Sequence, residues 1–328
     1  MERGTRPRRV AGALALVAAL LVGACGGDDA TAGGGSSPSR SPADAPATSV
    51  GAPSSTPAAP EPPPPPPVPQ LPRGGTTIYP QYRVVAHYGT AYSGALGVLG
   101  EGTPDEAALA IERSAAPFAT PDRAVQPVME LIVTVADRTP GPDGNYSHRL
   151  DPGPVRDYLA AARRHRQILV LDVQPGRSDF LSEVRAWEEL LAEPDVGLAL
   201  DPEWRMPPGE VPGGSIGTVD AAEVNAVVDW LAGLVRARGL PQKLLVLHQF
   251  TGGMITNLPA VSTPPELAVV QHLDGFGTPG QKLEKYTALQ RPDRFHMGFK
   301  LFLDEDTPIL SPAEALALVP PPEFVSYQ

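Results

Sequence analysis

From about residue 76 onward, hydrophobic and polar positions follow two alternating patterns. Short apolar runs of strand length are separated by amphipathic stretches with the period of a helix. Continuous apolar runs are typical of strands buried on both faces, as in parallel sheets. We expect strands over 82–88, 128–135, 167–173, 196–200, 243–249, 267–273 and 295–302, and helices over 104–118, 154–165, 179–191, 218–238, 280–289 and from 312 onward.

Seven strands with helices between most of them predict a (β/α)8 TIM-like barrel, complete or irregular, over residues 75–328. The eighth strand would be short, near Ile255-Thr256 or near Ile309. An open doubly wound sheet is the alternative. It is disfavoured because no glycine-rich phosphate loop follows the first strand.

Residues 1–24 have the features of an export signal. Arg6, Arg8 and Arg9 precede an apolar run over 10–22 that is too short for a stable membrane span, and the run leads to Cys25. The end of this segment, Val22-Gly23-Ala24-Cys25, resembles the lipobox of bacterial lipoproteins. The resemblance implies acylation of Cys25 and a lipid anchor at the extracytoplasmic face of the cell membrane. An ordinary secretory signal with an incidental cysteine is the alternative.

Residues 25–74 are rich in Gly, Ser, Ala, Thr and Pro, and they include the run from Pro62 to Pro67. Such a segment can bury almost no apolar surface, so we predict a disordered, proline-stiffened tether. The whole chain has 41 prolines, and its richness in Ala, Arg, Gly and Pro resembles that of actinobacterial proteins.

Charge and cysteine content exclude several kinds of function. The net charge of -11 argues against a nucleic-acid partner. Cys25 is the only cysteine, so the predicted barrel has no disulfide, cysteine metal cluster or thiol nucleophile. We expect no metal site and no cofactor in the barrel, since the sequence has neither the dinucleotide fingerprint nor a Gly-Lys-Ser/Thr phosphate loop.

Polar side chains gather at the predicted carboxyl ends of the strands. In a barrel these ends converge on one mouth, where the active sites of this fold lie. Side chains two residues apart share a face of a strand, as expected for Asp201 and Glu203 after the run 196–200. The candidate site residues are His87, Tyr88, Asp172, Gln174, Asp201, Glu203, Trp204, His248, Gln249, His272, Asp274 and Lys300.

Paired carboxyl groups are what glycoside hydrolysis requires: one protonated acid, and one carboxylate that acts as base, nucleophile or charge stabiliser. We predict that Glu203 is the acid and that Asp201 raises the pKa of Glu203 and orients the substrate or a water. Asp172 would keep a proton shared within the cluster. Either an inverting or a substrate-assisted mechanism fits this spacing. Tyr88, Trp204 and Phe250 would stack on sugar rings. The hydroxyl groups of a polysaccharide would be bound by His87, Gln174, His248, Gln249, His272, Asp274 and Lys300.

Two short segments carry a family resemblance. Leu200-Asp201-Pro202-Glu203-Trp204 resembles the Asp-x-Glu strand end of barrel glycosidases, including lysozyme-type muramidases and chitinase-like enzymes. His248-Gln249-Phe250-Thr251 resembles a Trp-Gln-Tyr-Thr segment of the muramidases. The resemblance implies a glycoside hydrolase-like barrel that acts on cell-envelope or environmental polysaccharide. As a whole, the domain is similar to an uncharacterised family of bacterial surface lipoproteins.

Two other functions are open at this point. A barrel can keep a binding site at its mouth without catalysing a reaction. A non-catalytic module that binds a glycan or a protein is therefore the first alternative. The second is a metal-dependent phosphodiesterase, because Val84-Val85-Ala86-His87-Tyr88-Gly89 resembles the His-Arg-Gly strand of glycerophosphodiesterase barrels. That resemblance implies Glu130 as a metal ligand and His248 as the acid/base, but Tyr88 stands where that family has arginine.

Overall fold

The computed structural model describes residues 68–328, which form one compact unit. The predicted signal over 1–24, Cys25 and most of the predicted tether lie outside the described residues. None of the helices between residues 68 and 328 has the length and apolar character needed to span a bilayer.

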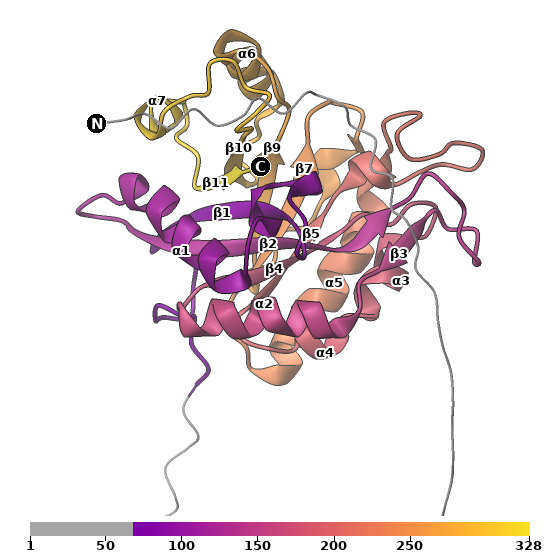
Figure 1. Cartoon of the computed structure of the whole chain (residues 1–328), viewed down its shortest axis with the longest axis horizontal. Helices are drawn as coiled ribbons and strands as arrows, with labels where there is room; N and C mark the ends of the chain where they lie inside the picture. The colour runs from indigo at the N-terminus through magenta and orange to yellow at the C-terminus, as the bar shows by residue number, and fades with distance from the viewer. Residues whose placement is uncertain (1–67) are drawn as a thin grey trace, which may run out of the picture. The chain divides into compact units, whose positions relative to one another are not determined.

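Parallel strands close into a barrel, which confirms the predicted fold (Figure 1). β1 pairs with β2 on one side and with β11 on the other, so the ring has no open edge. In spatial order the eight strands are β1 (Tyr82–Thr90), β11 (Phe324–Tyr327), β10 (His296–Leu301), β9 (Leu267–Leu273), β7 (Lys243–Gln249), β5 (Val196–Leu200), β4 (Ile168–Val173) and β2 (Ala124–Ala136).

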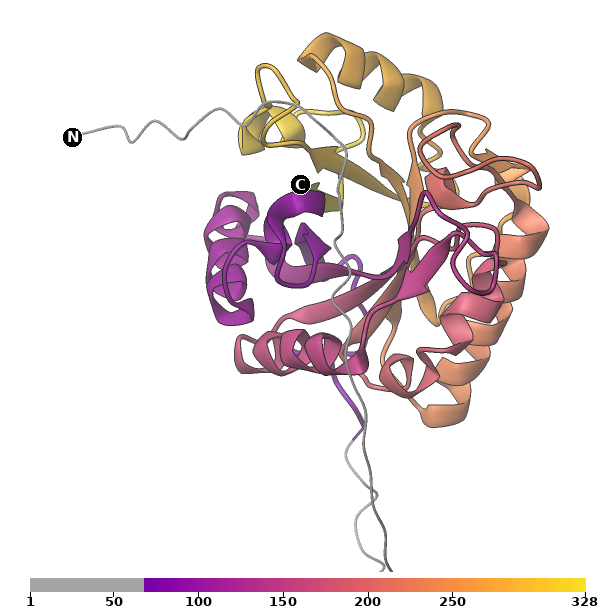
Figure 2. The same cartoon turned by 45° about the vertical axis from the view of Figure 1, so that its right-hand side comes forward.

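Helices surround the ring of strands (Figure 2). Capping boxes begin three of them, with Thr103, Thr278 and Ser311 as N-caps. The stretch predicted as one helix over 179–191 forms two short helices. The helices are α1 (Pro104–Ala115), α2 (Pro152–Arg164), α3 (Phe180–Arg185), α4 (Glu188–Leu191), α5 (Ala221–Arg238), α6 (Pro279–Leu289) and α7 (Pro312–Leu316).

The predicted position of the eighth strand is wrong. Ile255–Thr256 is β8, which pairs with β6 (Val219–Asp220) in a separate two-stranded sheet, and Ile309 lies in a loop. The strand that closes the barrel is β11, near the end of the chain. Its four residues follow a proline-rich turn, so no extended apolar run marks it in the sequence.

The barrel interior is apolar from its amino-terminal end to its middle. Small and branched side chains fill it, and Leu71, Ile78 and Tyr79, which precede β1, pack into the same core. The opposite faces of the strands pack against the surrounding helices, as Leu171 and Leu198 do. Asp172, His248 and Lys300 lie near the carboxyl ends of β4, β7 and β10, whereas Glu130 lies at the middle of the longer strand β2.

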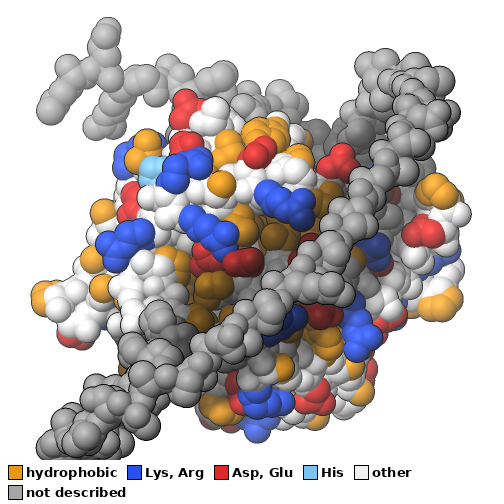
Figure 3. Space-filling view, turned by 90° about the horizontal axis from the view of Figure 1, so that it is seen from below, with side chains coloured by type: hydrophobic (Ala, Val, Ile, Leu, Met, Phe, Trp, Pro, Cys, Tyr) orange, Lys and Arg blue, Asp and Glu red, His pale blue; other side chains and the backbone are white. Residues whose placement is uncertain are grey.

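The outer surface carries charges of both signs. Figure 3 shows basic and acidic side chains interspersed over the side that lies at the bottom of Figure 1. Ion pairs join many of them, such as Arg163 of α2 with Asp195, whose Nε and Oδ2 atoms are 2.7 Å apart. This face therefore offers no extended area of a single charge to a polyanion.

Candidate active site

His248, near the carboxyl end of β7, is the centre of a buried ionic cluster. Its Nδ1 lies 2.8 Å from Oδ2 of Asp274, and its Nε2 lies 3.0 Å from Oε1 of Glu130 on β2. Burial disfavours the charged ring, but the hydrogen bonds with Asp274 and Glu130 raise the pKa of His248 well above its usual value. The ring is therefore an imidazolium that donates a hydrogen bond to each carboxylate.

Asp172, on β4, is held by a tyrosine. The Tyr88 hydroxyl donates to Oδ2 of Asp172 at 3.0 Å and accepts from Nε2 of Gln174 at 3.1 Å. Burial raises the pKa of Asp172 well above its usual value, and the charges of Asp201 and Glu130 add to the effect. Asp172 therefore favours its protonated form, which fits its predicted place in a proton-sharing cluster.

Lys300, on β10, is the second cation of the site. Its Nζ lies 3.8 Å from Oδ2 of Asp274 and 3.8 Å from the centre of the Tyr88 ring. Only 3% of Tyr88 is exposed. The ring of Tyr88 is thus occupied by Lys300 and is not free to stack on a sugar, contrary to the prediction from sequence.

Asp201 and Glu203 stand at the end of β5, but not on the strand. The strand ends at Leu200, and Asp201 caps a 3-10 turn, η4 (Pro202–Trp204), by accepting a bond from the Glu203 backbone at 3.3 Å. Two-residue strand periodicity therefore does not apply to Glu203. The turn leaves Glu203 and Trp204 half-buried, whereas Asp201 is buried.

Both carboxyl groups at this turn hold protons more tightly than usual. Burial is the main cause and raises the pKa of Asp201 to about 7, with the charges of Glu203 and Asp274 adding to it. Burial and the Asp274 charge likewise raise the pKa of Glu203 to about 7, while Lys300 and His248 oppose the rise. Asp274, rather than the predicted Asp201, is therefore the main acidic neighbour acting on Glu203.

His272, on β9, packs against His248 of the cluster. Its ring centre lies 5.1 Å from that of His248, and its Nε2 lies 2.8 Å from Oγ of Ser326 on β11. Burial, followed by the nearby charges of His248 and Lys300, lowers the pKa of His272 well below its usual value. A Cβ atom at Gly298 would lie 2.6 Å from Nδ1 of His272, so glycine leaves room for this neutral ring.

Two candidate residues do not reach the cluster. His87 points to the helix layer, where its Nε2 lies 2.9 Å from Oγ of Ser114 on α1, and burial lowers its pKa to about 4. Gln249 also faces outward and accepts a 2.8 Å bond from Nε2 of Gln271. Adjacent residues of a strand face opposite sides, so His87 cannot share the interior with Tyr88, nor Gln249 with His248.

Glu130 joins the cluster although the sequence suggested it only as a phosphodiesterase metal ligand. Its signal is an ionisable residue type inside the apolar run of β2, where it is completely buried. The structure does not favour that metal-dependent reading, because Glu130 and His248 bond each other and His87 points away. Between residues 68 and 328, no three His, Cys, Asp or Glu side chains are arranged to hold a metal ion.

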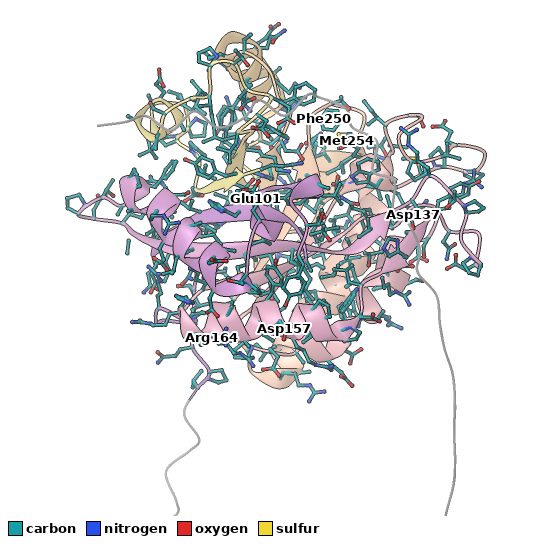
Figure 4. The ribbon with its side chains drawn as sticks, in the orientation of Figure 1. Glu101, Asp137, Asp157, Arg164, Phe250 and Met254 are labelled. Atoms are coloured by element: carbon teal, nitrogen blue, oxygen red, sulfur yellow. The ribbon has the colours of Figure 1, made fainter. Side chains whose placement is uncertain are left out.

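The loops that follow the strands build a rim around the cluster. The loop after β5 is tied to the loop after β4, since the Met206 backbone donates to the Gly176 carbonyl at 2.7 Å and Arg177 donates to the Glu210 carbonyl. After β7, Phe250 and Met254 lie close together (Figure 4), and the Phe250 backbone donates to the Met254 sulfur at 3.2 Å.

Comparisons with known proteins identify no family for the chain. No protein-family model and no curated protein matches it. Among solved structures, it is similar to a trimodular endoglucanase of subfamily GH5_4, with 12% sequence identity and a TM-score of 0.41. The match covers 75% of this chain and 55% of the endoglucanase, so the chain spans about half of that protein's length. The barrel assignment rests on strand order and register, not on this similarity.

Proposed function

We propose that this protein is a glycoside hydrolase, held at the extracytoplasmic face of the cell membrane, that acts on cell-envelope or environmental polysaccharide. The observation that carries the proposal is the position of Glu203. It is a half-buried carboxyl group on which the charges of the buried residues Asp274, Lys300 and His248 act, and a second carboxyl group, Asp201, caps the same turn. Cleavage of a glycosidic bond requires such a pair of carboxyl groups.

Glu203 would act as the general acid. An ordinary glutamate is ionised at neutral pH, whereas a pKa of about 7 keeps a proton available for the leaving oxygen. Asp201 would orient the substrate or the attacking water and would stabilise positive charge at the sugar ring. The proton released by water returns to a carboxylate of the pair, which restores the starting state.

The deeper residues would set the charge of the mouth and fix its geometry. His248 and Lys300 partly neutralise Glu130 and Asp274, so the electrostatic field around Glu203 is arranged before any ligand binds. Trp204, half-buried next to Glu203, would offer its indole ring to a sugar.

A non-catalytic glycan-binding barrel is the second candidate, and one observation favours it. Glu130, Asp172 and His248 have no exposed surface, so a ligand cannot touch them without a movement of the mouth. In that case Glu203 and Trp204 would be recognition groups only.

Hydrolysis of a panel of cell-envelope glycans distinguishes the two candidates. We expect the wild-type chain to release new reducing ends and Glu203→Gln to be slower by about 10²-fold or more. Glu188→Gln, on the exposed surface of α4, is the matched control and should equal the wild type. Binding without cleavage would support the non-catalytic barrel, and an active Glu203→Gln variant would refute the assignment of the acid.

The membrane anchor is tested separately. We expect the wild-type chain, expressed in a bacterium that processes lipoproteins, to fractionate with membranes and the Cys25→Ser variant to be released. If Cys25→Ser stays in the membrane fraction, acylation of Cys25 is not what holds the protein there.

A further inference from the structure

Phe276, in the loop after β9, is an unusually exposed aromatic residue. The residue is 63% exposed, and its ring and that of Phe302 pack edge to face, with ring centres 5.8 Å apart and planes at 74°. Phe302, in the loop after β10, is only 8% exposed. Both loops follow the carboxyl ends of their strands, so the pair lies on the same side of the barrel as the ionic cluster.

A single buried carboxylate fixes both loops. Oδ1 of Asp306 accepts a bond from the Gly277 backbone, next to Phe276, and Oδ2 accepts one from the Phe302 backbone, each at 3.0 Å. Nζ of Lys282 neutralises Asp306 at 2.7 Å. The exposed ring is therefore carried by a rigid support, and a ligand that covered it would lose little free energy to loop ordering.

The aromatic pair is continuous with the site. The Phe302 ring centre lies 5.4 Å from Nζ of Lys300, and the same Nζ lies 3.8 Å from Asp274 in the cluster. A row of contacts thus leads from the cluster through Lys300 and Phe302 to the exposed ring of Phe276. Lys300 and Phe302 are only 3% and 8% exposed, so Phe276 is the part of this row that a ligand extending beyond Glu203 can contact.

We propose that Phe276 is a stacking platform for a sugar ring beyond the one bound at Glu203, so that the ligand is an oligosaccharide or polysaccharide and not a simple glycoside. This inference rests on the proposed glycan-binding site. The flat C–H face of a sugar ring covers a phenyl ring, while its hydroxyl groups, at the edge, stay in contact with water. Continuity with the cluster is what favours a glycan chain over a protein partner at this position.

Binding to ladders of increasing length tests the proposal. The ladders are β-1,4-linked glucose and β-1,4-linked N-acetylglucosamine oligosaccharides, and all variants carry Glu203→Gln to prevent cleavage. We expect affinity to rise with length, and Phe276→Ala to bind the longest members about tenfold more weakly and the shortest members equally well. Phe276→Trp should keep the dependence on length. Leu109→Ala, an exposed apolar position on α1, is the control and should change nothing.

The outcomes separate this inference from the proposed function. If Phe276→Ala binds every length as well as its parent does, the platform is refuted, while cleavage by the wild-type chain would leave the catalytic proposal standing. If neither ladder binds to any variant, and the wild-type chain cleaves neither, both ideas fail for these glycans and the platform is withdrawn. Loss of affinity for all lengths alike would also refute it, because a platform beyond the first ring cannot affect the shortest ligand.

Discussion

Nε2 of His248 lies 3.0 Å from Oε1 of Glu130, and neither side chain is exposed to solvent. The two residues come from β7 and β2, which are separated by β5 and β4 in the ring. Their hydrogen bond therefore crosses the inside of the barrel. It joins strands that no backbone hydrogen bond connects.

Removal of the imidazolium should destabilise the fold. His248→Ala leaves Glu130 and Asp274 buried without their shared partner, so we expect the free energy of unfolding to fall by about 3–5 kcal/mol. Urea denaturation at neutral pH measures this free energy of unfolding. His148→Ala, which breaks a pair with Asp137 that is exposed to solvent, is the control and should cost less than about 1 kcal/mol. Equal losses of unfolding free energy in the two variants would show that charge interactions do not stabilise the cluster.

The pH dependence of cleavage should report the pKa of Glu203. A general acid acts only when protonated, so kcat/KM should fall by about tenfold per pH unit above the pKa of about 7. The positive charge of Lys300 lowers the pKa of Glu203, so Lys300→Met should move this decline to higher pH. A decline that begins near the pKa of an ordinary glutamate would show that Glu203 is not the acid.

Asp201 should make the protein less stable as the pH rises. Its pKa is about 7 in the folded chain and about 3.9 in an unfolded one, so the folded state binds the extra proton between these values. The resulting stabilisation is complete below pH ~4 and is lost as the pH rises through 7. Asp201→Asn should therefore match the wild type near pH 4 and exceed its unfolding free energy by about 4 kcal/mol at pH 8. Denaturant titrations at both pH values would contradict this if the difference did not change with pH.

Gly298 should not tolerate a side chain. A Cβ atom there would lie 2.6 Å from Nδ1 of His272 and 2.9 Å from Cγ1 of Val270, inside a closed barrel. We expect Gly298→Ala to lower the free energy of unfolding by about 1–3 kcal/mol. Gly233→Ala, on α5 with no atom within 4 Å of its new Cβ, should instead raise it by about 0.5–1 kcal/mol. Thermal denaturation of the two variants is the comparison to make.

The barrel could be predicted because the period and length of the hydrophobic pattern distinguish its long strands from its long helices. β2 contains a long apolar run, and α5 has an apolar stripe at helical spacing. The N-cap at Thr103 marks the start of α1. β11 has only four residues, and its pairing with β1 depends on closure of the whole ring, so no local pattern could reveal it.

The candidate site was predictable where polar residues end apolar strands. Asp172, His248 and Asp274 do meet, as convergence at a barrel mouth requires. The orientation of a side chain was harder to predict, because a shift of one residue reverses its direction. For this reason the prediction that His87 faces the barrel mouth is wrong. The 3-10 turn that directs Glu203 toward solvent also has no signal in the hydrophobic pattern.

The order of the strands around the ring follows their order along the chain, so the ring closes between β1 and β11. β1, the first strand between residues 68 and 328, has β11, the last strand of this range, as a neighbour, with Val84 opposite Phe324. During synthesis, the edges of β1 and β10 that later face β11 have no partner until Phe324–Tyr327 emerges. Unpaired edges can associate with other chains. A chain whose synthesis stalls before Phe324–Tyr327 is made would therefore present an almost complete barrel with two open strand edges that can aggregate.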